Sequence, residues 1–150
     1  MAVPQTVESD PIEIATAFIA CINAADISGL CELMTEDHVF QDALGKRFVG
    51  RETMRHGWQQ YLAMVKNYKV YAQEYFVRDR QVAIFGTASG SYQPAGGAPA
   101  QGAEGFWEIP AAWSVAVRGT LVRSRSISRK GQTTRKGNKT YCCRRKPPKG

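Results

Sequence analysis

The amino-acid sequence predicts one α+β domain in which three helices gather on one side of a bent sheet. Two segments near the N-terminus and a third after residue 50 repeat apolar residues at helical spacing. Three runs typical of long strands follow, over residues 68–77, 81–92 and 105–117. Helices followed by antiparallel strands are typical of the α+β class. A chain of 150 residues is long enough to bury one core.

The first helix is expected over residues 10–24, because Asp10 can cap it and Pro11 suits its first turn. Its apolar stripe is made by Ile12, Ala15, Ile19 and Ile22, widened by Ile14, Phe18 and Cys21. Asp26 can cap a second, short helix that carries Ile27, Leu30, Leu33 and Met34.

Residues 37–45 are expected to form the first strand and to enter a hairpin around Gly45. Alternation places His38, Phe40 and Asp42 on one face. At about 3.3 Å per residue, His38 and Asp42 lie roughly 13 Å apart, which is too far for a catalytic dyad. We therefore expect Asp42 to point into a pocket without His38 as its partner.

The third helix follows Gly50, and its apolar positions show the best helical periodicity in the chain: Met54, Trp58, Tyr61, Leu62 and Val65. Gly86 and Gly90 interrupt the middle long strand, and we expect the sheet to bend or bulge there. The loop over 93–104 is long for a compact domain, and loops of this kind often cover the mouth of a site.

Charge is divided unevenly along the chain. All 13 acidic residues precede residue 109, whereas 12 of the 20 basic residues lie in 118–150. The first 117 residues thus have a net charge of −5 and the remainder +12, so the overall pI says little about partners. Four cysteines, with Cys142 and Cys143 adjacent, lack the spacing of a zinc site, and buried reduced thiols are the expectation for Cys21 and Cys31. No run of 18 apolar residues and no secretory signal are found, so the cytoplasm is the expected location.

Three phrases resemble the SnoaL-like branch of the nuclear transport factor 2-like superfamily: LMTEDHVFQD at 33–42, VGRETMR at 49–55 and FGTASG at 85–90. The resemblance covers about residues 10–118. The superfamily includes polyketide cyclases, ketosteroid isomerase and limonene epoxide hydrolase. It implies a cone-shaped roll, also called cystatin-like, in which a strongly curved mixed sheet wraps around the long first helix. An apolar pocket opens at one end of the cone.

The resemblance implies that Asp42 stands where ketosteroid isomerase carries its proton-abstracting aspartate. A developing enolate oxygen also needs a hydrogen-bond donor. No acid is found around 111–113 to play that part, and His38, Tyr61, Tyr75, Trp107 or Trp113 could donate instead. The Asp-Arg-Asp set of the epoxide hydrolase is not found. The expected lining is aromatic: Phe18, Phe40, Trp58, Tyr75, Trp107 and Trp113.

The function expected from this resemblance is a cofactor-free and metal-free isomerase, cyclase or hydrolase that uses Asp42 as base on a small apolar or polycyclic molecule. A homodimer is expected as well. Two other interpretations stay open. In the first, Asp42 only serves the hairpin turn and the aromatic residues belong to the core. In the second, the domain is a non-catalytic binding or dimerisation module of the same fold.

The C-terminal segment departs from the family pattern. We expect an arm over 1–9, the domain over 10–128 and a basic tail over 129–150, since apolar periodicity ends near 129. Leu121, Arg123, Arg125 and Ile127 permit one short strand. The tail could bind nucleic-acid phosphates, could be solvated without a partner, or could be an out-of-frame sequence that begins near codon 118. The last is the favoured hypothesis, and reading the other two frames of the gene tests it.

Overall fold

The structure is a computed structural model that describes residues 9–93 and 105–129, and its elements follow the predicted order. The three helices are α1 (Pro11–Asn23), α2 (Ile27–Glu32) and α3 (Arg51–Met64). The six strands are β1 (Met34–Gln41), β2 (Arg47–Val49), β3 (Val65–Arg78), β4 (Gln81–Tyr92), β5 (Phe106–Arg118) and β6 (Leu121–Arg129). The predicted loop from residue 94, Cys142, Cys143 and the tail from residue 130 lie outside the described residues.

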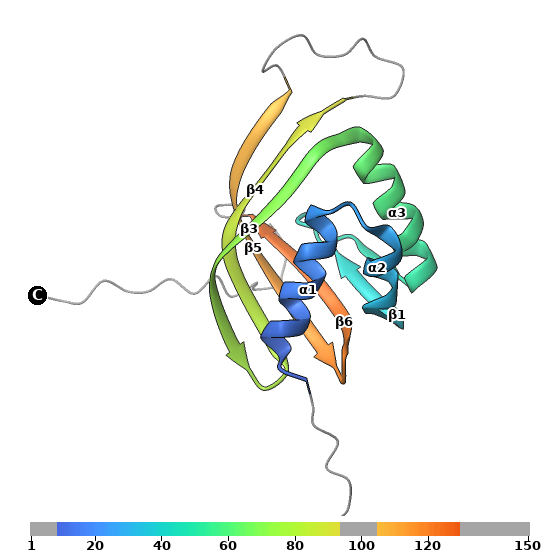
Figure 1. Cartoon of the computed structure of the whole chain (residues 1–150), viewed down its shortest axis with the longest axis vertical. Helices are drawn as coiled ribbons and strands as arrows, with labels where there is room; N and C mark the ends of the chain where they lie inside the picture. The colour runs from blue at the N-terminus through green and yellow to red at the C-terminus, as the bar shows by residue number, and fades with distance from the viewer. Residues whose placement is uncertain (1–8, 94–104, 130–150) are drawn as a thin grey trace, which may run out of the picture.

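The strands form one mixed sheet in the order β2-β1-β6-β5-β4-β3. Neighbouring strands are antiparallel except β1 and β6, which are parallel. The sheet is strongly curved, and all three helices lie on its concave side (Figure 1). This confirms the α+β class and the curved mixed sheet around the first helix.

The core lies between α1 and the concave face. The cap predicted at Asp10 is present, since its carboxylate accepts a hydrogen bond from the amide of Ile12 at 2.9 Å. Phe18 and Ile22 are buried on the sheet side of α1 and pack in one cluster with Val82 and Val122. Burying such side chains supplies most of the stability of a domain of this size.

Two boundaries near β1 differ from the prediction. The second helix ends at Glu32 and Met34 already begins β1, so the strand starts three residues earlier than Asp37. β1 ends at Gln41, and Asp42 belongs to the turn that follows. The reason is local: the backbone carbonyl of Asp42 accepts a hydrogen bond from the amide of Gly45, and the amide of Asp42 donates to the carbonyl of Lys46.

The predicted bends at Gly86 and Gly90 are confirmed by the pairing of β3 with β4. The register shifts between Ala72 and Glu74, opposite Gly86, and again between Lys66 and Lys69, opposite Gly90. A β-carbon at Gly86 would overlap the backbone carbonyl oxygen of Tyr71. Glycine therefore allows the two strands to approach closely where the sheet bends.

β6 completes the sheet between β1 and β5, and it contains a bulge. Val122 pairs with Val117 of β5 and Ser124 pairs with Ala116, so Arg123 is an extra residue without a partner in the ladder. An extra residue reverses the alternation of side chains along a strand. As a result Val122 and Arg125, three positions apart, are both buried.

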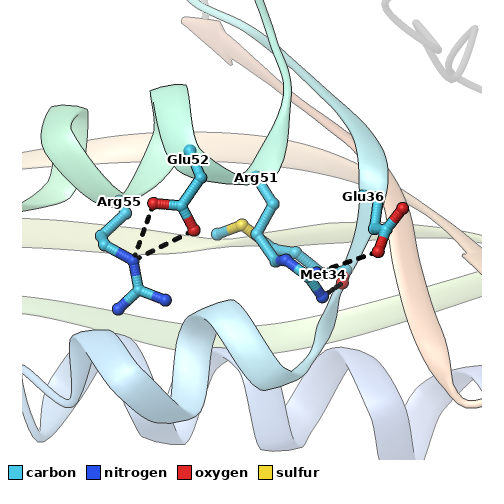
Figure 2. Close-up of polar contacts among 5 residues, drawn as sticks. All are labelled: Met34, Glu36, Arg51, Glu52 and Arg55. Carbon is cyan, nitrogen blue, oxygen red and sulfur yellow. Dashed lines mark hydrogen bonds and ion pairs between the residues drawn. The ribbon is translucent and has the colours of Figure 1, made fainter.

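The N-terminal turn of α3 is held against β1 by a few polar contacts. Figure 2 shows the guanidinium of Arg51 beside the carbonyl oxygen of Met34, at 3.4 Å, and the carboxylate of Glu36, at 3.5 Å. Arg55 and Glu52 form an ion pair within the helix. Glu36 is almost fully exposed, so such pairs add little stability. Burial of Met54 and Trp58 is what fixes α3 on the sheet.

Candidate functional site

A cavity of about 680 Å³ opens between α3 and the concave face of the sheet. Its walls are mostly apolar and come from β1, β2, α3, β3, β4, β5 and β6. The volume falls within the range of small-molecule sites in proteins. The cavity is the main candidate site in the described part of the chain.

The structure brings together six of the nine residues expected at a site. The lining includes Phe40, Asp42, Trp58, Tyr61, Trp107 and Trp113. Phe18, His38 and Tyr75 do not line the cavity. Phe18 is buried beneath α1 and stacks on His38, with 6.2 Å between the ring centroids. Tyr75 lies beyond the β3 bulge opposite Gly86 and packs against the core from there.

His38 is buried against α1, where its ring stacks on that of Phe18. It therefore lies on the concave side of β1, the side of Phe40, but it faces α1 and not the cavity that Phe40 lines. The Nδ1–H group of His38 donates to the carbonyl oxygen of Val122 at 2.8 Å, so Nε2 is the unprotonated nitrogen, and it has no hydrogen-bond partner among the described residues. Burial lowers the pKa of His38, opposed by the hydrogen bond to Val122.

Asp42 lies at the edge of the cavity, and its carboxylate is held by the hairpin turn. Oδ1 accepts hydrogen bonds from the amides of Leu44 and Lys46, both at 2.9 Å. No hydrogen bond to Oδ2 is found among the described residues. The turn thus orients the carboxylate through one oxygen only.

Arg125 is a cavity residue that the sequence interpretation did not select. It is 4% exposed and lies beside Phe40, its partner in the parallel ladder of β1 and β6. Its guanidinium carbon is 5.6 Å from the ring centroid of Phe40 and 5.5 Å from that of Trp58, within the range of a cation–π interaction.

The cavity contains further polar groups on its aromatic rings, and the side chains of Thr53 and Gln60 line it as well. Tyr68 forms a side-chain hydrogen bond with Arg125, and its ring meets that of Tyr61 edge-on at 5.0 Å. The indole N–H groups of Trp58 and Trp113 are buried and have no hydrogen-bond partner among the described residues. Arg125 is the one basic residue among the described residues that line the cavity.

The signal for Arg125 in the sequence was weak. Strict alternation from the buried Val122 would place Ser124 and Ser126 inside and Arg123 and Arg125 outside. The bulge at Arg123 reverses that order. Burial lowers the pKa of the Arg125 guanidinium, and the neighbouring Tyr68 raises it.

Comparison with known proteins agrees with this architecture. The sequence profile of the SnoaL-like domain matches residues 15–124. The chain belongs to the SnoaL-like domain family. The match extends through the bulge of β6 to Ser124, so family-like sequence continues past residue 118, where the change of reading frame was hypothesised.

Several solved structures of other proteins share the fold of this SnoaL-like chain. A protein of ketosteroid isomerase-like fold from Catenulispora acidiphila, solved in complex with trimethylamine, is 25% identical with a TM-score of 0.65, over 77% of this chain and 83% of that one. A proposed polyketide cyclase from Xanthomonas campestris is 16% identical with a TM-score of 0.69, over 79% and 88%. A cystatin-fold protein from Novosphingobium aromaticivorans is 19% identical with a TM-score of 0.66, over 81% and 99%. No curated protein is significantly similar to the chain.

Two further observations apply to residues 9–93 and 105–129. No cluster of three or more His, Cys, Asp or Glu side chains suited to a metal ion occurs there. None of the three helices in this part of the chain has the length and apolar character needed to cross a bilayer.

Proposed function

We propose that this SnoaL-like protein is a proton-transfer enzyme, an isomerase or cyclase, that acts on a largely apolar cyclic carbonyl compound with Asp42 as its general base. The observation that carries the proposal is the position of Asp42 at the edge of a largely apolar cavity that also contains the hydrogen-bond donors of Tyr61, Tyr68 and Arg125. Hydrolase chemistry is less favoured, because a hydrolase would also need a bound water molecule that one of these polar groups activates.

The proposed reaction divides the work between the two parts of the cavity. The turn amides hold Oδ1 of Asp42, and Oδ2 accepts the proton from a carbon next to the carbonyl group. Negative charge then moves to the carbonyl oxygen. Donors on the aromatic wall, among them the hydroxyl groups of Tyr61 and Tyr68, would stabilise that charge. This chemistry needs neither metal nor organic cofactor.

The cavity does not favour a cation such as the trimethylamine bound by the Catenulispora protein. Trimethylamine is protonated at neutral pH, and its binding would use the faces of aromatic rings. Here the guanidinium of Arg125 already lies over Phe40 and Trp58. A carbonyl compound fits this cavity better than an amine.

Asp42→Asn should lower the rate of proton exchange on an accepted ketone by about 10²- to 10⁴-fold, the contribution usual for a general base. Asparagine keeps an oxygen for the amides of Leu44 and Lys46, so the turn should persist. NMR in D₂O, following loss of the protons next to the carbonyl over a panel of cyclic ketones, measures the rate. Asp37→Asn, which changes an exposed carboxylate outside the cavity, is the matched control. A variant Asp42→Asn with full activity would refute the role of Asp42.

The homodimer expected from the sequence is part of the proposal. Tyr71, Phe76 and Phe85 are exposed on β3 and β4, and the rings of Phe76 and Phe85 meet edge-on at 5.7 Å. Such a surface suits association with a second copy. Phe85→Glu should shift the protein from dimer to monomer in sedimentation velocity, with the circular dichroism spectrum unchanged. If the wild-type protein sediments as a monomer at a concentration on the order of 100 µM, the dimer is excluded.

A further inference from the structure

The cavity contains the positive charge of Arg125, with which no carboxylate forms an ion pair among the described residues. Arg125 is 4% exposed, and its hydrogen bond to Tyr68 and its contacts with two aromatic rings involve neutral groups. No ion pair to Arg125 is found among the described residues. Burying a charge without a partner of opposite sign is costly. Where the cavity opens to solvent, water can solvate part of the guanidinium and lessen this cost.

A neutral ligand would increase that cost. It would displace the water around Arg125 and offer only weak acceptors in return. An anionic oxygen group would supply the missing charge and accept hydrogen bonds from the guanidinium, which has five N–H donors and no acceptor. The hydroxyl groups of Tyr61 and Tyr68, which line the same cavity, could donate to further oxygens of the same ligand.

The remaining walls limit the shape of the ligand. Trp58, Tyr61, Tyr68 and Trp107 form a chain of ring contacts, with centroids 5.0 to 6.1 Å apart from Trp58 to Tyr61, Tyr61 to Tyr68 and Tyr68 to Trp107. Rings fixed against each other in this way favour flat, aromatic surfaces. The anionic group and a flat ring system are therefore both matched by the cavity.

We propose that the cavity binds a flat aromatic or polycyclic compound that carries a carboxylate or a similar anionic oxygen group, and that Arg125 is the residue that selects this charge. This deepens the proposed function by naming its substrate class and rests on it for the chemistry. Arg125 pairs with Phe40, two residues before Asp42, so Phe40 and Asp42 are about 7 Å apart along the chain. One cyclic molecule could therefore contact both Arg125 and Asp42.

Equilibrium binding of a matched pair of probes tests the inference without any turnover. The probes are 2-naphthoate and its neutral analogue 2-naphthamide, followed by isothermal titration calorimetry at neutral pH. Wild-type protein should bind 2-naphthoate at least about tenfold more tightly, as a charged hydrogen-bonded pair allows. Asp42→Asn should keep this preference, so failure of the subsite and failure of the proposed base are distinguishable.

Two arginine variants on the same strand provide the matched comparison. Arg125→Met removes the buried charge and should reduce the preference for 2-naphthoate to less than about threefold, whereas Arg125→Lys should keep part of it. Arg123→Met removes the exposed neighbouring charge and should leave the preference unchanged. Circular dichroism checks that each variant folds.

Several results would overturn the inference. They are equal binding of both probes to the wild-type protein, binding of neither probe at millimolar concentration, a preference that survives in Arg125→Met, and an equal loss in Arg123→Met. The first two need no variant, so the proposal can fail even if Arg125→Met does not fold.

Discussion

Gly86→Ala is expected to destabilise the protein by about 3 kcal/mol, whereas Gly57→Ala should stabilise it by up to about 1 kcal/mol. A β-carbon at Gly86 would overlap the carbonyl oxygen of Tyr71 on β3, a backbone atom that cannot move without separating the strands. A β-carbon at Gly57, on the exposed surface of α3, meets nothing within 4 Å. Alanine is also the better helix former there.

Urea unfolding followed by circular dichroism measures both changes on one scale. Domains of this kind have a free energy of unfolding of roughly 5–15 kcal/mol, so the Gly86 variant should show a clearly lower midpoint. Neutral surface substitutions change the free energy of unfolding by up to about 0.5 kcal/mol. If the free energy of unfolding of Gly86→Ala lies that close to the wild-type value, β3 and β4 can separate freely at the bend. Ala88 lies two residues further along β4 and lines the cavity, so this variant should also weaken probe binding.

The parts of the fold that local chemistry determines were predictable from the sequence. The cap at Asp10, the proline in the first turn and the apolar spacing located α1 to within a residue at each end. Gly86 and Gly90 marked the bends because a β-carbon at Gly86 would overlap the backbone of β3 and one at Gly90 would overlap the side chain of Val65. The resemblance supplied the wrapping of the sheet around the first helix, which no local pattern contains.

What the sequence did not reveal depends on contacts between distant strands. The bulge at Arg123 is defined by pairing with β5, and nothing in the local composition marks it. Without the bulge, Arg125 belongs to a row of exposed basic residues, and the segment from residue 118 looks like the start of a charged tail. With the bulge, the same residue is the buried cation of the cavity.

Asp42 shows how both interpretations of one residue can describe the same side chain. The turn role and the site role were alternatives at the level of the sequence. In the structure Oδ1 serves the turn while the residue also lines the cavity. A turn that orients a carboxylate is a suitable support for a base, so the two roles are compatible.

His38 should make the protein less stable as the pH falls below about 6.5. Its pKa is lowered in the folded protein, first by burial and then by the positive charge of Arg125, while Val122 and Asp37 oppose the shift. In the unfolded chain the histidine has its ordinary pKa near 6.5. Below that pH the unfolded state binds a proton that folded His38 does not, so stability rises with pH across this window and is lost on acidification.

His38→Asn should remove this part of the acid dependence. Asparagine can still donate a hydrogen bond to the carbonyl oxygen of Val122, which His38 contacts through Nδ1, but it does not take up a proton. One proton bound on unfolding gives a slope of at most about 1.4 kcal/mol per pH unit, and the variant should lack it. The urea midpoints of wild type and His38→Asn between pH 5 and 8 measure the difference in pH dependence. His56→Asn, on the exposed face of α3, is the control. Parallel pH profiles for wild type and His38→Asn would show that His38 accepts a proton inside the fold, through a rearrangement that supplies its Nε2 with a partner.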